Sequence, residues 1–293
     1  MDFLKIQQTS KNTFDSENLW CPFPGYAAFG GQLAAHSLSA GLKTIPEEHL
    51  PNLVHTLFLN PGDPNKKIVY SVESLKDGKH LSMREIRGKQ DDTLVCVTTM
   101  SASAKDSNTR DFSYIKEEIV EDEYISLHQY VVRSLEALRK KSTEAKSAKE
   151  VEYLVKQYDL LMENLGVLNS TFSVEIGSMI KNRRQIKIST LKENVSQKDF
   201  SLYMTLASDL LLVESALLSL NLNIFSHELY KACSIDHNLH FIKNEVPEDR
   251  TVYYIVRCDN VVESKAVIEG KIVNSKGEIL ALTSQQALIR IRK

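Results

Sequence analysis

Cysteine and tryptophan are scarce in this chain of 293 residues, which has four cysteines and a single tryptophan. The cysteines, Cys21, Cys96, Cys233 and Cys258, are scattered, with no Cys-x-x-Cys pair and no histidine at metal-ligand spacing. This spacing argues against a structural zinc site and against a disulfide scaffold. It favours reduced, mostly buried thiols in an intracellular protein, and we expect neither a bound metal nor a cofactor.

An excess of one charge and long apolar runs are also missing. The formal net charge is −2, so nothing global indicates binding to nucleic acid or to an anionic membrane. No run of about 18 apolar residues occurs, so we expect no transmembrane helix. Met1–Lys5 lacks the apolar core of a signal peptide, and Arg290–Lys293 does not match the Ser-Lys-Leu peroxisomal address. The absence of a Gly-x-Ser-x-Gly elbow argues against a serine hydrolase.

One stretch is strongly apolar, from Ala207 to Leu220. From Leu210 onward it is apolar on nearly every face, which is typical of a buried helix. We expect Ser208 to be the N-cap of this helix and Asp209 to lie in its first turn, where the helix dipole favours a negative charge. Asp209 is then either a helix cap or a carboxylate positioned for chemistry, and this stretch alone favours the cap.

Strand-like runs occur in two sets of four, one near each end of the chain. The runs are Leu53–Leu59, Lys67–Leu75, His80–Lys89 and Thr93–Ser101, then Ser234–Ile242, Thr251–Cys258, Ser264–Asn274 and Ile279–Ile291. A short strand within residues 1–20 and a helix over Gln32–Leu42 precede the first set. A strand over Gln185–Leu191 and the apolar helix precede the second. The pattern therefore predicts an internal duplication of strand, helix and four strands, too long in period for a solenoid.

Between the two sets, apolar residues follow helical spacing twice, from Ile125 to Leu138 and from Val151 to Leu165. We predict a helical hairpin or two amphipathic helices there. An antiparallel sheet wrapped round a long apolar helix is the hot-dog fold. The predicted class is therefore α+β, a double hot-dog with an N-terminal hot-dog over 1–105, a helical linker over 106–165 and a C-terminal hot-dog over 166–293.

Several motifs in order resemble the acyl-CoA thioesterase II family, double hot-dog enzymes with bacterial and peroxisomal members. The matching segments are Phe29–Gln32, His55–Asp63, Ile68–Gly78, Ala207–Leu210, Ser234–Phe241 and Thr283–Gln285. Residues 106–200 match poorly. The resemblance covers most of the chain, and a series of motifs in order is more specific than any one of them.

The resemblance implies a catalytic set of an Asp, a Thr or Ser, and a Gln, which falls on Asp209, Ser234 and Gln285. Ser234 stands where many members have Thr, and both offer a hydroxyl. Two departures concern the acyl pocket: Asn52 stands where the family commonly has His, and the strand over Gln185–Leu191 lacks the common Trp.

Thioester chemistry is compatible with these residue types. A leaving thiol has a pKa of roughly 8.5, so little acid assistance is needed at the sulfur. Asp209 would accept a proton from water, Gln285 and Ser234 would orient that water, and no covalent intermediate is implied. Backbone N–H groups of Gly30 and Gly31 would face the thioester oxygen.

Histidines are weaker candidates. We place His55 with Gly30 and Gly31 among the substrate-binding residues, although sheet or helix contacts are the more ordinary role for His55 and His237. Asp236 and His237 look like a dyad, but adjacent strand residues point to opposite faces, and Asp236 is interpreted as structural. Glu214, within the apolar helix, either pairs with a basic group or faces the interface between the halves.

We expect an acyl-CoA thioesterase that hydrolyses fatty acyl-CoA to free fatty acid and CoA. The alternatives are an enoyl-CoA hydratase or dehydratase, for which no motif with an Asp and a His is found, and a non-catalytic acyl-CoA-binding protein. The expected partner is the fatty acyl-CoA substrate, with no nucleic acid and no membrane, and a homo-oligomer through the hot-dog sheets stays open. The resemblance implies a peroxisomal location, and the cytoplasm is the alternative.

One active site per chain is expected, although the chain has two halves. The predicted helix of the first half begins with Gly30–Gln32, where that of the second half begins with Ser208 and Asp209, so the first half lacks a carboxylate there. The last strand of the first half ends in Thr98–Met100 where the second has Thr283–Gln285, so it lacks the amide as well. The two halves would then build one composite site.

Overall fold

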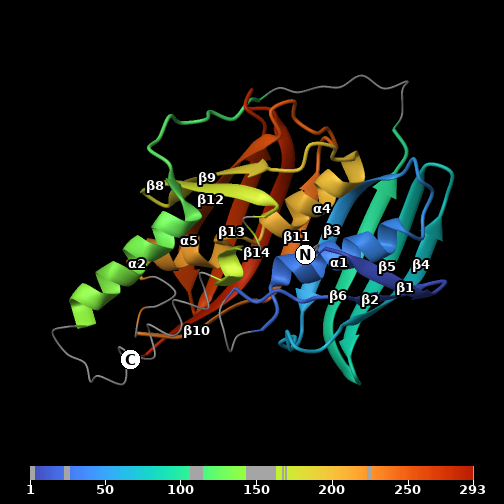
Figure 1. The fold of residues 1–293 in the computed structure, drawn as a ribbon, viewed down its shortest axis with the longest axis horizontal. Coiled ribbons are helices and arrows are strands. Elements are labelled where there is room, and N and C mark those ends of the chain that lie inside the picture. The colour runs from blue at the N-terminus through green and yellow to red at the C-terminus, as the bar shows by residue number, and fades with distance from the viewer. Residues whose placement is uncertain are drawn as a thin grey trace.

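The structure is a computed structural model that describes residues 4–22, 27–105, 115–142, 163–166, 168, 170–222, 226 and 228–292. Most of the second helix predicted within the linker, over 151–165, lies outside these residues. The remaining elements form one large antiparallel sheet with helices against one face (Figure 1).

The first half contains a hairpin, a helix and four long strands. They are β1 (Ile6–Ser10), β2 (Thr13–Ser16), α1 (Gly30–Leu42), β3 (Leu50–Phe58), β4 (Val69–Asp77), β5 (Leu81–Gln90) and β6 (Thr93–Ser103). All four strands of the first predicted set are present, with bounds that differ by at most three residues. The single strand predicted within residues 1–20 is a hairpin of two strands.

The second half repeats this order with additions. Its elements are β7 (Ile125–Ser126), α2 (Leu127–Ser142), β8 (Phe172–Ile180), β9 (Arg183–Thr190), α4 (Gln197–Ala207), α5 (Leu212–Ser219), β10 (Leu229–Ser234), β11 (Asp236–Phe241), β12 (Thr251–Val262), β13 (Lys265–Val273) and β14 (Ile279–Ile291). The sequence did not predict β8 or β10. Although β7 lies within the predicted linker, it pairs with β8 of the second half. The division at 105 and 165 stays a prediction.

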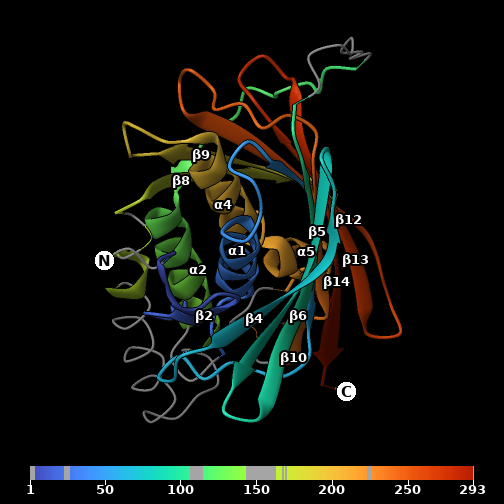
Figure 2. The same ribbon diagram turned by 90° about the vertical axis from the view of Figure 1, so that its right-hand side faces the viewer.

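Within the described residues, fourteen strands form one continuous sheet in the order β1-β2-β4-β5-β6-β3-β11-β14-β13-β12-β9-β8-β7, and β10 pairs with β14. The halves meet where β3 pairs with β11, with Asp236 opposite Leu57 and Asn238 opposite His55. Figure 2 shows the strands curving along one side of α1, α4 and α5. This is the double hot-dog arrangement expected from the sequence.

Small side chains allow α1 to lie close to the sheet. Twelve of its 13 residues are buried, among them Ala34, Ala35 and Ala40. Gly41 has no room for a Cβ because Met100 of β6 packs directly against it. The α1 helix also packs against α4, so the central helices of the two halves are in contact.

The apolar helix of the second half is broken, which corrects the sequence prediction. Ser208 is the C-cap of α4 and not an N-cap. Asp209 lies in the turn between α4 and α5 rather than in a first helical turn, and Leu211 has a left-handed backbone with φ of 61° before α5 begins. The counterpart of α1 therefore starts at Gln197, so the alignment of Gly30 with Ser208 was wrong.

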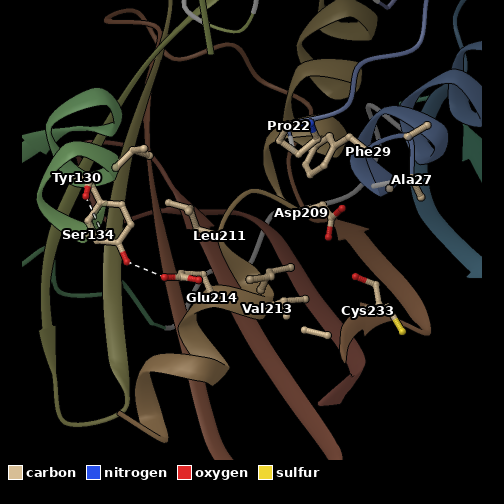
Figure 3. Close-up of a pocket in the computed structure, with 16 residues that line it drawn as sticks. Pro22, Ala27, Phe29, Tyr130, Ser134, Asp209, Leu211, Val213, Glu214 and Cys233 are labelled. Atoms are coloured by element: carbon tan, nitrogen blue, oxygen red, sulfur yellow. Dashed lines mark hydrogen bonds between the residues drawn. The ribbon is translucent and has the colours of Figure 1, made fainter. Parts of the chain in front are cut away.

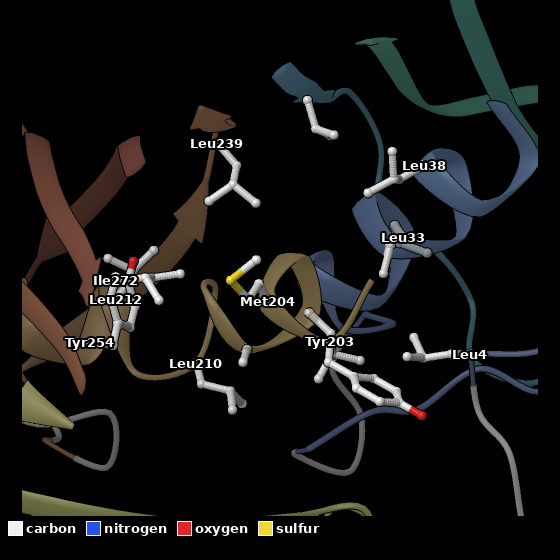
Figure 4. Packing of buried hydrophobic residues seen from close by; sticks show 14 of the residues in the cluster. Leu4, Leu33, Leu38, Tyr203, Met204, Leu210, Leu212, Leu239, Tyr254 and Ile272 are labelled. Atoms are coloured by element: carbon white, nitrogen blue, oxygen red, sulfur yellow. The ribbon is translucent and has the colours of Figure 1, made fainter. Parts of the chain in front are cut away.

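Together α4, the turn and α5 form the centre of the C-terminal core. Leu206 and Leu212 are fully buried, and Figure 4 shows Met204, Leu210 and Leu212 among side chains from the sheet. The stretch Gln197–Ser219 has the length and composition of a membrane span, but 78% of its most apolar window is buried within the protein. A core helix passes the same test.

Candidate active site

Asp209 joins the two halves of the molecule. Its Oδ2 atom accepts a hydrogen bond of 2.8 Å from the backbone N–H of Gly31, at the second position of α1. The first N–H groups of a helix have no intrahelical partner, and Phe29, the N-cap of α1, makes no capping bond with its side chain. Asp209 therefore caps a helix of the opposite half and lies at the positive end of that helix dipole.

Glycine at positions 30 and 31 makes this contact possible. A Cβ on Gly31 would lie 2.5 Å from the carbonyl oxygen of Leu206 and 2.9 Å from Cβ of Asp209. A Cβ on Gly30 would lie 2.9 Å from Oδ2 of Asp209. Since real Cβ atoms do not approach so closely, any side chain here would push Asp209 away from the helix.

Gln32 holds the loop that leads into this helix. Gln32 is fully buried. Its Oε1 accepts a hydrogen bond of 2.6 Å from the backbone N–H of Trp20, and its Nε2 donates to the backbone carbonyl of Asn18 at 2.9 Å. The rings of Trp20 and Phe29 pack edge to face at 5.0 Å. The motif Phe29–Gln32 thus supplies an aromatic side chain, two positions without a Cβ and an anchor for the loop.

Burial changes the acidity of Asp209. The side chain is removed from water, which raises its pKa to about 7, while the Gly31 N–H and the side chain of Gln285 act in the opposite direction. A carboxylate with a pKa near neutrality accepts a proton efficiently at physiological pH. Asp209 therefore has the environment of a general base.

We expect kcat/KM for thioester hydrolysis to follow the ionisation of Asp209. Only the carboxylate accepts a proton, so the rate should fall about tenfold per unit of pH below an apparent pKa near 7 and level off above it. Initial rates at subsaturating substrate between pH 5 and 8.5 measure this. A rate that is flat from pH 5.5 to 8 would show that Asp209 is not the base.

Gln285 and Ser234 lie beside Asp209, although they come from different strands. Gln285 on β14 is 1% exposed and donates through Nε2 to Oγ of Ser234 at 2.6 Å. Ser234 is the last residue of β10. A bend at Ile235 separates this strand from β11. The structure therefore brings the predicted Asp, Ser and Gln together around one point.

Asp236 of β11 binds the backbone of β14, the strand that carries Gln285, from the opposite face of the sheet. Its Oδ1 accepts from the N–H of Gln286 at 2.8 Å, and its Oδ2 lies 3.2 Å from Nε2 of His55. His237 points the other way, into the core, where Nε2 lies 2.7 Å from Oγ of Ser208. Alternation along β11 thus separates Asp236 from His237, and His55 pairs with Asp236. A substrate contact for His55 stays a prediction.

A cavity of about 250 Å³ opens beside Asp209 (Figure 3). It is mostly apolar, and it is lined by Pro22, Ala27, Ala28, Phe29, Gly30, Tyr130, Val131, Ser134, Asp209, Leu211, Leu212, Val213, Glu214, Ala232, Cys233 and Ser234. Asp209 and Ser234, two of the three predicted catalytic residues, therefore lie at the wall of an apolar pocket of the kind that holds an acyl chain.

The far wall of this pocket is polar, and part of it comes from α2, a helix in which the sequence predicted no site residue. The Tyr130 hydroxyl donates to Oε1 of the buried Glu214 at 3.0 Å. The guanidinium of Arg184 lies 4.7 Å from the centre of the Tyr130 ring. Figure 3 shows Tyr130 and Glu214 across the pocket from Asp209. Glu214 thus contacts a tyrosine that also contacts a basic residue.

Among the described residues, no group of three or more His, Cys, Asp or Glu side chains could hold a metal ion. The four cysteines are free thiols, and Cys233 is on the pocket wall.

The fold and the site define a double hot-dog protein with a buried carboxylate beside an apolar pocket. Two family models match, the acyl-CoA thioesterase N-terminal domain over residues 19–104 and the acyl-CoA thioesterase C-terminal domain over residues 196–289. Together they cover more than half of the chain. The chain belongs to the acyl-CoA thioesterase family and is an acyl-CoA thioester hydrolase.

Individual relatives agree with this. Acyl-CoA thioesterase 2 of Haemophilus influenzae is 24% identical over 270 residues, which span 89% of this chain and 87% of that protein. The peroxisomal acyl-coenzyme A thioester hydrolase 1 of Saccharomyces cerevisiae is 31% identical over 90 residues, 31% of this chain and 26% of that protein.

Solved structures resemble the whole fold. The acyl-CoA thioesterase II TesB2 from Mycobacterium marinum superposes with a TM-score of 0.73 at 17% identity, over 99% of this chain and 96% of that one. A hot-dog protein of unknown function from Alicyclobacillus acidocaldarius has a TM-score of 0.69 at 11% identity, over 99% and 97% of the two chains. At these identities the likeness shows the fold alone.

Proposed function

We propose that the chain hydrolyses fatty acyl-CoA by direct attack of a water molecule that Asp209 deprotonates. The observation that carries the proposal is the hydrogen bond between Asp209 and Gly31 at the wall of an apolar pocket. It combines a carboxylate from one half, the N-terminus of a helix from the other half and space for an acyl chain. Two carboxylate oxygens are available, so Asp209 can keep its bond to Gly31 and accept a proton as well.

The steps balance without a covalent intermediate. Asp209 takes a proton from water as the water oxygen bonds to the thioester carbonyl carbon, and a tetrahedral oxyanion forms. The oxyanion collapses, the carbon–sulfur bond breaks and CoA leaves as a thiolate, which then takes the proton held by Asp209. Gln285 and Ser234 orient the water through their amide and hydroxyl groups.

The donor for the oxyanion is assigned to Gly30. The N–H of Gly31 is already bonded to Asp209, which revises the expectation that both glycines face the thioester. Gly30 lines the pocket as the first residue of α1, and its N–H belongs to the group without intrahelical partners. An oxyanion there would also lie at the positive end of the α1 dipole.

The hydratase alternative is less compatible with the site. That chemistry needs an imidazole beside the substrate, and none of the pocket-lining residues in the described part of the chain is a histidine. His237 is only 1% exposed and contacts Ser208. The remaining alternative is a binding protein without activity, and turnover of acyl-CoA in an assay would exclude it.

Release of CoA from palmitoyl-CoA tests the proposal. Because the protein has its own thiols, the fatty acid product should be quantified by mass spectrometry beside the thiol assay. Single turnover in ¹⁸O-labelled water should place the label in the fatty acid and none in the peptide containing Asp209. Label in that peptide would reveal an acyl-enzyme anhydride and contradict direct attack.

Replacing Ser234 separates its hydroxyl from its size. We expect Ser234→Thr to keep activity within about threefold, since Thr retains the hydroxyl and suits a strand. Ser234→Ala removes a partner of Gln285 and should lower kcat by about 10-fold or more. Steady-state kinetics of the three proteins decide the matter, and equal activity would remove Ser234 from the mechanism.

We assign the reaction to the peroxisome or the cytoplasm. The relative from Saccharomyces cerevisiae is peroxisomal by name, and the cytoplasm is the alternative. Imaging of a fluorescent fusion against a peroxisomal marker distinguishes the two compartments.

A further inference from the structure

Two buried polar atoms near Asp209 have no hydrogen-bond partner among the described residues. They are Nδ1 of His237 and Oε1 of Gln285. Both residues are only 1% exposed. An unpaired buried polar atom is costly and calls for an explanation. Asn238 lies opposite Ser284 on the paired strands β11 and β14, so His237 and Gln285, the next residues along these strands, are neighbours. The Gln285 side chain also raises the pKa of His237 against the larger effect of burial.

The other ends of these side chains are connected. Nε2 of His237 lies 2.7 Å from Oγ of Ser208, the residue before Asp209. Nε2 of Gln285 donates to Ser234, and the same side chain lowers the pKa of Asp209. A path therefore runs from Ser208 through His237 and Gln285 to Ser234 and Asp209.

His237 is neutral at physiological pH. Burial lowers its pKa to about 4, although Gln285 and Asp236 raise it and His55 lowers it further. A neutral imidazole has one N–H donor and one acceptor nitrogen. The nitrogen that bears the hydrogen therefore determines which group each neighbour must offer to the ring.

We propose that His237 is a positioning residue that donates from Nδ1 to Oε1 of Gln285 and thereby turns the NH₂ group of this amide toward Asp209 and Ser234. In this arrangement Nε2 of His237 accepts a hydrogen bond from the Ser208 hydroxyl, which gives up the 2.9 Å bond that it donates to the carbonyl of Thr205. Both unpaired atoms acquire partners after a small adjustment of the two side chains.

The opposite orientation of the amide is disfavoured by charge. It would place the carbonyl oxygen of Gln285 against the carboxylate of Asp209, and the NH₂ group against Nδ1. A carboxylate accepts hydrogen bonds but cannot donate them, so that arrangement loses a favourable contact and adds a repulsive one. His237 thus selects the amide orientation that the reaction needs.

This inference rests on the proposed role of Gln285 in orienting the water. It adds that the histidine acts from behind, with no contact to substrate. Outer partners that orient metal ligands change activity by about 10- to 100-fold when they are removed, and we expect an effect of the same order for a histidine that orients Gln285. The effect should fall on kcat and not on KM, because the acyl pocket is left intact.

A matched pair of amide substitutions tests the position of the donor. The side chain of His237→Asn can place its amide nitrogen near the position of Nδ1. The longer side chain of His237→Gln places its amide nitrogen near the position of Nε2 instead. We expect His237→Asn to retain kcat within about fivefold. We expect His237→Gln to lose about 10- to 100-fold in kcat with unchanged KM. The apparent pKa in its pH–rate profile should rise because Asp209 loses the Gln285 contact.

The tautomer of His237 can be determined without an activity assay. In wild-type protein with ¹⁵N-labelled histidine, the ring nitrogen shifts of His237 should identify Nδ1 as the protonated nitrogen, and His237→Asn should remove only this signal. Ser208→Ala deletes the donor to Nε2 and is a second variant if His237→Gln does not fold. It should weaken the preference for this tautomer and lower kcat less than His237→Gln.

Protonation at Nε2 in the wild type, or equal kcat for His237→Gln and the wild type, would overturn the inference. These outcomes differ from failure of the proposed function. If Asp209→Asn were active, the mechanism itself would be wrong, whatever the state of His237. If Asp209→Asn is inactive and His237→Gln is not, only the positioning role fails.

Discussion

Asp209→Asn should lower kcat for acyl-CoA hydrolysis by about 100-fold or more and should also raise the melting temperature at pH 8. Asn retains the shape of Asp and an oxygen that can accept from the Gly31 N–H. It cannot take a proton from water at neutral pH, and a general base contributes about 10²- to 10⁴-fold. The same change therefore has opposite effects on activity and stability.

The gain in stability follows from the raised pKa. An ordinary Asp ionises near 3.8, and Asp209 in the folded protein ionises near 7. Between these values the folded state binds more protons than the unfolded state, so the contribution of Asp209 to stability falls as pH rises from about 4 to about 7. At 1.36 kcal/mol per unit, the cost above pH 7 is on the order of 4 kcal/mol.

Paired measurements of activity and thermal unfolding across pH examine both parts. The melting temperature of Asp209→Asn should exceed that of the wild type at pH 8, and the difference should shrink toward pH 4, where the carboxyl of Asp209 in the folded wild type is uncharged, like the amide that replaces it. Asp236→Asn is a matched control, because Asp236 is partly exposed and bonded on the opposite face of the sheet. Near wild-type turnover in Asp209→Asn would refute the assignment of the base.

Gly31→Val should lower kcat by about 100-fold or more, although Gly31 and Asp209 are 178 positions apart. The added Cβ would lie 2.5 Å from the Leu206 carbonyl oxygen and 2.9 Å from Asp209 Cβ, so α1 and the α4–α5 turn must separate. A displacement of roughly 1 Å at a reacting group can cost about 100-fold in rate. The base would also lose its bond to the helix N-terminus.

Gly62→Ala is the matched control for this experiment. A Cβ there would lie 3.4 Å from Ala28 and 3.5 Å from Val95, which is ordinary contact. Kinetics and circular dichroism of both variants show whether Gly31→Val loses activity while it remains folded. Full activity of Gly31→Val would rule out a site built from both halves.

The number of sites follows from the same contact. Asp209 and Gln285 belong to the second half, and Gly30 and Gly31 belong to the first, so each chain should bind one equivalent of a non-hydrolysable acyl-CoA analogue at a catalytically relevant site. In the first half, the predicted counterpart of Gln285 is Met100, which is 2% exposed and packs under Gly41. Calorimetric titration measures the stoichiometry, and two equivalent sites would contradict the composite arrangement.

The sequence by itself determined the duplicated strand pattern and the segments that carry the site. Alternation and turn residues located the four long strands of each half, since these strands bury one face. The nine-residue β8 and the six-residue β10 were not predicted, because β8 lies in a region with little resemblance and β10 immediately precedes β11. The residues Asp209, Ser234 and Gln285 were selected only by their joint occurrence within matched motifs.

Only the tertiary structure decided how those residues act. The run from Ala207 to Leu220 has no Gly or Pro to indicate a break, yet Leu211 adopts a left-handed backbone between α4 and α5. The pairing of Asp209 with Gly31 and of His237 with Ser208 depends on helices and strands packed from distant parts of the chain. Local periodicity describes which face of an element is buried, whereas the partner that covers this face is chosen by the packing of the whole core.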